Sequence, residues 1–304
     1  MNGRQTRQGI FFALAAYFLW GITPVYFRLL DHVATRDMLA HRIIWSFFFM
    51  LILLSISGNW PQVYRAGKKG NHMLLLAITA LLIAGNWLLF LWAINHQRML
   101  ETSLGYFISP MVSVLFGMLF FGERFRRLQW LAIALTCAGV LVQLWQFGSL
   151  PVIALGLAIS FALYGLLRKK IGIDVQTGLL IETLWLLPLA GLYLLIFADN
   201  SASMSVYSWN LNVLLVLSGA VTTIPLLFFA SAANCLRLST LGFFQYLHPT
   251  LIFLLAVMFY NEAVSSSKIL TFVFIWVALA VLALDAFYAR RQLKFKRKTN
   301  AMPS

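Results

Sequence analysis

Two charged residues lie well inside long apolar stretches of this 304-residue sequence. Glu182 is one of nine carboxylates and falls deep within such a stretch, and Arg42 does the same. A charge at the centre of a bilayer costs roughly 2.5–3.5 kcal/mol on insertion scales, so such a residue normally faces a cavity or a partner. Both are therefore candidate solute-binding residues, and the alternative is a structural role holding helices together.

Polar residues also precede two prolines within apolar stretches. Tyr106 lies four residues before Pro110, and Gln245 and His248 precede Pro249. A proline inside a helix removes one backbone donor and frees the carbonyl four residues earlier. Because broken helices line the substrate sites of many transporters, these three polar residues are candidate binding residues. A kinked structural helix whose polar neighbours are satisfied is the alternative.

Four further residues fall near the middle of predicted membrane spans. They complete the candidate binding set: Trp20, Trp45, Asn86 and Tyr164. Arg42 and Trp45 lie three residues apart, close enough on a helix for a cation beside an indole, an arrangement that can hold an aromatic or zwitterionic solute. Packing in a symmetric core is the alternative for the aromatic residues.

Other chemistries lack their residue patterns. The sequence contains no GxxxxGK[ST] loop, no GxSxG and no HExxH, so neither ATP-driven transport nor catalysis is indicated. Its two cysteines, Cys137 and Cys235, have no neighbouring ligands. We expect no catalytic residue, no metal and no cofactor. Glu182 and His248 are instead candidates for coupling to protons.

Membrane-spanning helices must position these residues. The chain is 61% hydrophobic and 11% charged, and its mean hydropathy is +0.84, which suits a lipid bilayer. Continuous apolar stretches of about 20 residues match a hydrocarbon core of roughly 30 Å and favour helices over a barrel. The predicted spans are 9–29, 37–57, 73–95, 102–121, 128–146, 151–168, 177–197, 210–233, 239–260 and 268–289.

The basic residues indicate orientation. The net charge of +14 comes from short clusters between apolar stretches, so membrane topology explains it better than nucleic-acid binding. Placing the N-terminus in the cytoplasm puts 18 of the 23 Lys and Arg residues on that side. We expect a multi-pass protein of the cell inner membrane with both termini cytoplasmic and no nucleic-acid partner. The residues from Arg290 onward are expected to form a disordered basic end, and those from Asp199 to Asn210 a simple connector.

One segment occurs twice. SLGYFISPMVSVLFGMLFFGE, from Ser103 to Glu123, resembles TLGFFQYLHPTLIFLLAVMFYNE, from Thr240 to Glu262, and both the prolines and the final glutamates are 139 residues apart. Five spans per half is an odd number, so the halves must cross the membrane in opposite directions. The predicted fold is an all-α membrane protein of ten transmembrane helices in two inverted five-helix repeats, 1–148 and 149–289, followed by a basic tail at 290–304.

The repeat also relates Arg42 to Glu182, 140 residues apart. The inverted arrangement places Arg42 in the periplasmic third and Glu182 in the cytoplasmic third, each roughly 9 Å deep at 1.5 Å per residue. About 12 Å then separates them in a 30 Å core. A direct salt bridge is therefore expected only with helix tilt or intervening water.

Glu123 and Glu262 each end one span just before another begins. A carboxylate there can stabilise the N-terminal dipole of the following helix. Arg126 and Arg127 are expected to pair with Glu123. A gating role for the two glutamates is the alternative.

The chain resembles the drug/metabolite transporter superfamily of the EamA type and, within it, the RarD group. The segments that carry the resemblance are 7–21, 41–50, 85–95, 103–132, 150–170 and 239–250. The resemblance implies ten helices that export small organic molecules, with amphenicol-type drugs or amino-acid-like metabolites as possible substrates.

These observations together predict a secondary transporter, an exporter or exchanger of small organic metabolites or drugs that works by alternating access. A non-transporting scaffold or accessory subunit is the alternative, and it predicts a dry, apolar centre. A membrane enzyme is disfavoured because no nucleophile, base or metal ligands cluster by spacing.

Overall fold

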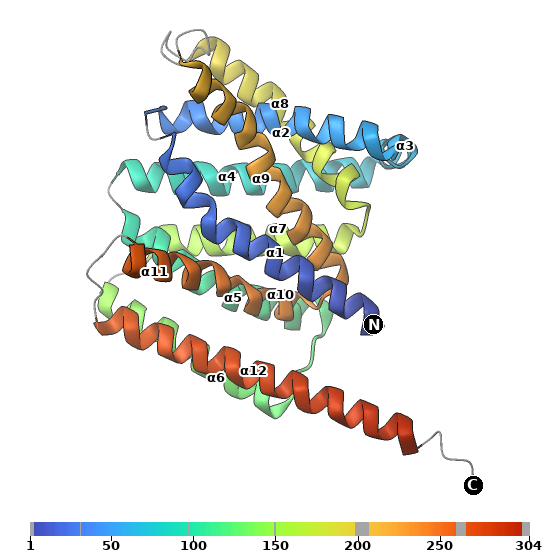
Figure 1. Cartoon of the computed structure of the whole chain (residues 1–304), viewed down its shortest axis with the longest axis vertical. Helices are drawn as coiled ribbons and strands as arrows, with labels where there is room; N and C mark the ends of the chain where they lie inside the picture. The colour runs from blue at the N-terminus through green and yellow to red at the C-terminus, as the bar shows by residue number, and fades with distance from the viewer. Residues whose placement is uncertain are drawn as a thin grey trace.

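The computed structural model describes residues 3–30, 32–96, 98–148, 150–197, 207–259 and 266–299, and the regular elements in these ranges are helices (Figure 1). Their bounds are α1 Gly3–Arg28, α2 Thr35–Ser57, α3 Trp60–Gly67, α4 Gly70–Asn95, α5 Met99–Phe121, α6 Arg127–Phe147, α7 Val152–Ile171, α8 Val175–Ile196, α9 Trp209–Cys235, α10 Leu238–Gln245, α11 Leu247–Phe259 and α12 Ser266–Thr299.

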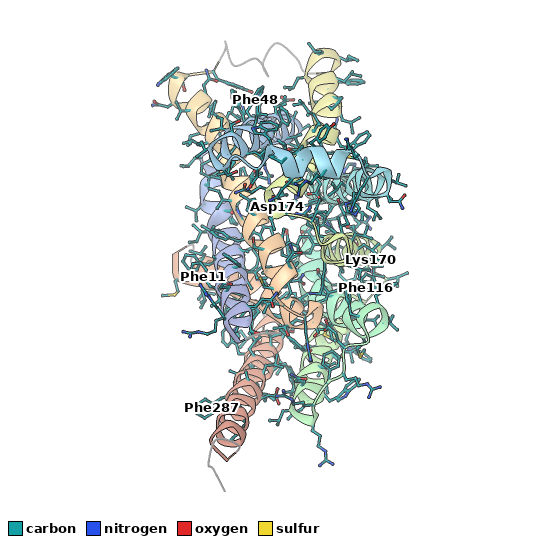
Figure 2. The ribbon with its side chains drawn as sticks, turned by 90° about the vertical axis from the view of Figure 1, so that its right-hand side faces the viewer. Phe11, Phe48, Phe116, Lys170, Asp174 and Phe287 are labelled. Carbon is teal, nitrogen blue, oxygen red and sulfur yellow. The ribbon has the colours of Figure 1, made fainter. Side chains whose placement is uncertain are left out.

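Within these ranges, ten helical segments are long and apolar enough to cross a membrane, which confirms the ten predicted spans. The short α3 adds no crossing, and α10 with the start of α11 makes the ninth one, Leu238–Leu255. The protein is therefore a multi-pass membrane protein. Large apolar side chains on its outside, such as Phe11, Phe48 and Phe287, are exposed as lipid contact requires (Figure 2).

The helices form a bundle with two distinct ends (Figure 1). α6 and α12 pack together at one end, and α2 and α8 pack together at the other. Between them, α5 packs on α7 and α10, α4 packs on α7, and α1 packs on α9. This central layer carries most of the buried polar residues considered below.

The two copies of the repeated segment differ in their helices. α5 runs unbroken through Pro110, so the expected interruption is absent from the first copy. In the second copy the helix breaks at Tyr246, and Pro249 lies in the first turn of α11. A proline is tolerated there because first-turn N–H groups have no partner within the helix.

The two copies also pack against each other. A Cβ atom on Gly242 of α10 would lie 2.9 Å from the Pro110 carbonyl oxygen, so only glycine permits this approach. The Tyr246 hydroxyl donates a hydrogen bond to the Phe107 carbonyl at 3.2 Å. The Phe107 carbonyl lies next to that of Tyr106, which is the one that Pro110 was expected to free. Its hydrogen-bond donor comes from the second copy of the segment.

The C-terminal basic residues differ from the expectation. α12 continues to Thr299 and carries six basic residues beyond its membrane span, so the expected disordered end is wrong up to that residue. Arg and Lys are good helix formers and can extend a helix that has already formed. The predicted features at Glu262 and at residues 199–206 lie outside the described residues.

Candidate solute-binding site

Aromatic rings pack around the side chain of Arg42 in α2. Its Nε donates a hydrogen bond to the Thr222 hydroxyl of α9 at 2.9 Å. Its guanidinium carbon lies 4.5 Å from the ring centre of Phe27 in α1 and 5.1 Å from that of Trp87 in α4. Both distances suit cation–π contacts. Trp87, and not the expected Trp45, is the indole beside this cation.

Tyr106 and His248 meet beside Arg42. Their ring centres are 4.9 Å apart, edge to face, and the Tyr106 ring also lies 6.2 Å from that of Phe90 in α4. Tyr106 is close enough to Arg42 to interact with it electrostatically and is 36% exposed. Three predicted site residues, from α2, α5 and α11, are therefore brought together at one accessible place.

The side-chain amides of Asn86 and Gln245 form hydrogen bonds between helices and are not directed at Arg42. The Asn86 amide donates to the Leu157 carbonyl at 2.9 Å and to the Ser160 hydroxyl at 2.8 Å, which ties α4 to α7. The Gln245 side chain is 7% exposed and bonds with Ser109 and Ser113 of α5. Both amides have protein partners, as buried polar groups require.

Trp20 and Tyr164, equivalent by the repeat, belong to a single cluster of rings. Trp20 lies 5.9 Å from Phe161 and 5.7 Å from Phe229, and Tyr164 stacks on Phe229 at 5.9 Å. Tyr164 is fully buried. This cluster joins α1, α7 and α9, so the alternative of core packing describes both residues well.

Trp45 is held at a close helix crossing. A Cβ atom on Gly219 of α9 would lie 2.3 Å from the Trp45 carbonyl carbon, so the α2 and α9 backbones are in contact. The Ser46 hydroxyl donates to the Gly219 carbonyl at 3.2 Å. The Trp45 ring lies 5.8 Å from that of Phe48. Its Nε1 is buried and has no hydrogen-bond partner among the described residues.

Glu182 of α8 forms a second, sealed polar cluster. Its carboxylate accepts hydrogen bonds from the Thr79 hydroxyl at 2.6 Å and the Tyr164 hydroxyl at 3.4 Å. Arg168 Nη1 lies 3.6 Å from Glu182 Oε1, and both side chains are 3% exposed. Arg42 and Glu182 form no ion pair with each other in the described part of the chain.

A small cavity adjoins Glu182 between α2, α4, α8 and α9. It has a volume of about 20 Å³ and is lined in part by Ser46, Trp87, Glu182 and Thr223. The Thr223 hydroxyl is buried, and no residue in the described ranges bonds with it. Thr222 bonds with Arg42, so of two adjacent residues of α9 one contacts Arg42 and the other lines the cavity beside Glu182.

Glu123 does not stabilise the helix that follows it. Its carboxylate accepts hydrogen bonds from the backbone N–H groups of Leu238, at 2.7 Å, and Ser239, at 3.1 Å, so it caps α10. Arg126 pairs instead with Asp285 of α12, at 3.3 Å. Among the described residues Glu123 therefore forms neither of the expected pairs, with Arg126 or with Arg127, and its carboxylate is bonded to α10 and not to the N-terminus of the next helix.

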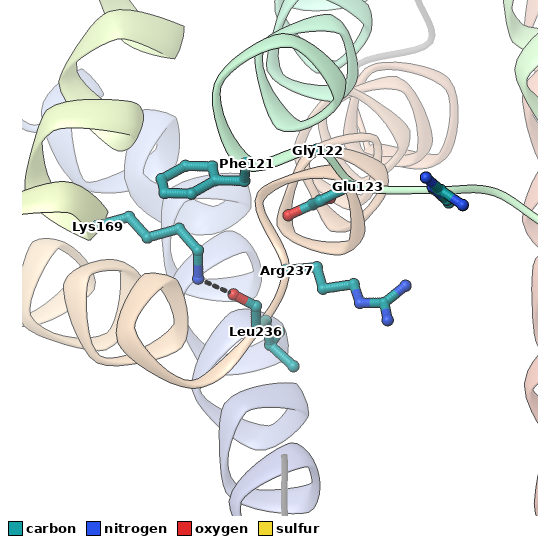
Figure 3. A pocket seen from close by; sticks show the side chains of 7 residues that line it. Phe121, Gly122, Glu123, Lys169, Leu236 and Arg237 are labelled. Atoms are coloured by element: carbon teal, nitrogen blue, oxygen red, sulfur yellow. Dashed lines mark hydrogen bonds between the residues drawn. The ribbon is translucent and has the colours of Figure 1, made fainter.

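A hollow of about 440 Å³ opens beside this cap, where α5, α7 and α9 end (Figure 3). The Lys169 ammonium donates hydrogen bonds to the carbonyls of Ala233, at 2.8 Å, and Leu236. Cations favour such helix C-termini. Glu123 and Lys169 thus tie the ends of α5 and α7 to the α9–α10 connection.

Members of the two polar clusters that sequence reasoning missed include Trp87, Thr79 and Arg168. The turn between α7 and α8 gave a signal for one of them. Arg168 precedes this turn by one helical turn and Glu182 follows it by two, so a long arginine side chain can reach the carboxylate. No comparable signal relates Trp87 of α4 to Arg42 of α2.

Ten membrane spans around a polar, aromatic-lined centre define the architecture of a membrane transporter. Residues 7–145 match the EamA-like transporter family. The chain is 60% identical over 293 residues to the protein RarD of Salmonella typhi, covering 96% of this chain and 100% of that protein. The chain belongs to the EamA-like transporter family.

Two further comparisons extend over nearly the whole chain. An uncharacterized transporter of Vibrio cholerae is 50% identical over 287 residues, covering 94% of this chain and 95% of that one. A solved crystal structure superposes with a TM-score of 0.70 at 19% identity, covering 96% and 99% of the two chains, which shows a shared fold.

Proposed function

We propose that the protein is a secondary transporter that moves a small organic solute across the inner membrane by alternating access between two inverted five-helix halves. The observation that carries this proposal is the meeting of Arg42 and Tyr106, from the first half, with Thr222 and His248, from the second. A site shared by both halves changes its access when the halves move relative to each other.

The packing of the helices supports an inverted repeat. α2 packs on α8, α5 packs on α10, and α6 packs on α12. Counted as membrane spans, these are spans 2 and 7, 4 and 9, and 5 and 10, so each of these spans packs on its counterpart in the other half. α1 also packs on α9, and α4 packs on α7; these are spans 1 and 8 and spans 3 and 6, two pairs that the repeat makes equivalent. A two-fold relation between the halves generates both kinds of pair.

Unequal exposure of equivalent positions supports alternating access. Arg42 is half-buried and its counterpart Glu182 is 2% exposed, while Tyr106 is 36% exposed and its counterpart Gln245 is 7% exposed. On the proposed topology, with both termini cytoplasmic, the more exposed member of each pair lies toward the periplasm. The ties made by Glu123 and Lys169 then hold helix ends together on the cytoplasmic side.

Cysteine labelling tests alternating access without knowledge of the solute. In a protein whose native Cys137 and Cys235 are replaced by Ser, Tyr106→Cys should react with a membrane-impermeant maleimide added from the periplasmic side. Glu123→Gln weakens the cytoplasmic tie and should slow that labelling. No reaction from either side would instead favour the scaffold or accessory-subunit alternative, in which the centre is sealed.

Flux through proteoliposomes tests transport itself. Chloramphenicol, tryptophan and indole-3-acetate serve as radiolabelled probes, with empty liposomes as the control. Saturable uptake of at least one probe is expected. Absence of saturable flux for all three, in protein that labels normally, would count against a transporter of this solute class.

Proton coupling through Glu182 and His248 is part of the proposal. An imposed pH gradient should change the rate of uptake, and Glu182→Gln should abolish that dependence because the amide cannot exchange a proton. Uptake that ignores the gradient and survives the Glu182→Gln substitution would remove the coupling hypothesis.

A further inference from the structure

Arg42 carries a positive charge within the membrane, and no described residue supplies its counter-ion. Its contacts are the Thr222 hydroxyl and the faces of two aromatic rings, with the Tyr26 and Tyr106 hydroxyls nearby. These neighbours are electrically neutral. No carboxylate of the described residues forms an ion pair with it.

The described carboxylates are engaged elsewhere. Glu182 bonds with Thr79 and pairs with Arg168. The other five and their partners are Asp37 with Tyr193, Glu101 with Arg98 and the Ile153 N–H, Glu123 with α10, Asp174 with Thr177, and Asp285 with Arg126 and Gln129. The described carboxylates therefore all have partners other than Arg42.

The free edge of the guanidinium is suited to an anion. Nε is used by Thr222, while Nη1 and Nη2 make no hydrogen bond with a described residue and are not fully enclosed. A planar guanidinium binds a carboxylate through two parallel N–H···O bonds. The rings of Phe27 and Trp87 limit the directions in which its plane can turn.

Aromatic walls surround this edge. Tyr106 is exposed and is packed by Phe90 and by His248. Flat apolar groups stack favourably on such rings. No acidic side chain of the described residues contacts these walls, so the site offers no charged partner to a cation.

We propose that Arg42 binds the carboxylate of the transported solute, and that Trp87 and Tyr106 receive its flat, apolar body. The solute class is thus an aromatic or similarly planar monocarboxylate. This inference rests on the proposed function and names the chemistry that the central site selects. The solute supplies the counter-ion that no described residue provides for Arg42.

Three probes with one ring system test the charge requirement. Indole-3-acetate, indole-3-acetamide and tryptamine carry a carboxylate, a neutral amide and an ammonium on the same indole. Thermal unfolding of the purified protein in detergent is measured against probe concentration, since a ligand of the folded state raises its stability. Indole-3-acetate should raise the unfolding temperature, and the other two should not.

Variants of one helix identify the residue responsible. Arg42→Gln should weaken the apparent affinity for indole-3-acetate at least tenfold, and Arg42→Lys should weaken it less because it keeps the charge but loses the paired bonds. Arg36→Gln removes an exposed arginine of the same helix and should leave affinity unchanged. If Arg42→Gln does not fold, Trp87→Leu and Arg42→Lys provide the comparison.

Equal stabilisation by the amide and the carboxylate would overturn the inference. So would carboxylate binding that is unchanged in Arg42→Gln, or an absence of stabilisation by millimolar indole-3-acetate. Binding in detergent does not require transport, so it can succeed while flux through proteoliposomes fails. Conversely, saturable flux of a neutral probe that is insensitive to Arg42→Gln would retain the transporter and remove the anion site.

Discussion

Gly178 of α8 holds open the space that the Arg168 guanidinium occupies. A Cβ atom at this position would lie 1.9 Å from Arg168 Nη1 and 2.8 Å from its Cζ, well inside van der Waals contact. Gly178→Ala must therefore displace the guanidinium. Since the same Nη1 approaches Glu182 Oε1 at 3.6 Å, the displacement separates a buried ion pair.

The expected loss of stability follows from the two unpaired charges that the substitution leaves in the interior. Both side chains are 3% exposed, so neither charge can be solvated where it lies. Breaking such a pair costs about 3–5 kcal/mol, against which alanine gains about 1 kcal/mol over glycine in a helix. Gly178→Ala should therefore destabilise the protein by about 2–4 kcal/mol.

Unfolding by SDS in mixed micelles, followed by tryptophan fluorescence, measures this difference. Gly191→Ala is the matched control, because it lies in the same helix and its added Cβ would meet no atom within 4 Å. This control should be neutral or slightly stabilising. The contrast between the two substitutions removes the general effect of alanine in α8.

A second background tests the cause. Replacing Arg168 by Met and Glu182 by Gln removes both charges together, which is often tolerated. Gly178→Ala added to that double variant should then cost far less, because the guanidinium that it displaces is gone. An equal cost in both backgrounds, or a Gly178→Ala protein as stable as Gly191→Ala, would refute the reasoning.

Three further substitutions probe other contacts. Glu123→Gln should accelerate hydrogen exchange at the first N–H groups of α10, because a charged acceptor is lost there; unchanged exchange would contradict the cap. Gly219→Ala should sharply reduce folded yield, since its Cβ would lie 2.3 Å from the Trp45 backbone; normal yield would show that α2 and α9 can separate cheaply. Tyr246→Phe should lower stability by about 1–3 kcal/mol, because the buried Phe107 carbonyl loses its donor; the SDS assay reports it, and no loss would indicate a replacement partner.

The membrane spans were predictable because each depends only on local composition. About 20 consecutive apolar residues specify a crossing wherever they occur, and all ten predicted spans correspond to helices. The unequal behaviour of Pro110 and Pro249 was not predictable in this way. Both follow similar sequences, yet α5 is continuous and the second copy breaks at Tyr246.

The partners of the charged residues were harder to predict because a membrane helix shows little of its rotation in its sequence. In a soluble protein, a polar face and an apolar face indicate which side of a helix is buried. Here the lipid-facing and core-facing sides are both apolar, so nothing along α4 identified Trp87 as the neighbour of Arg42. Depth could be calculated, but rotation could not.

The two charges related by the repeat therefore differ in a way that the sequence alone did not reveal. Glu182 has a cation and two hydroxyl donors and is sealed, whereas Arg42 has one hydroxyl acceptor and nitrogens that are not fully enclosed. Under alternating access, closing the outer side would bury the Arg42 charge. Without a bound anion, that charge would be buried with no counter-ion from a described residue. A bound carboxylate removes that cost, so the free-energy barrier to closure would depend on whether the solute is present.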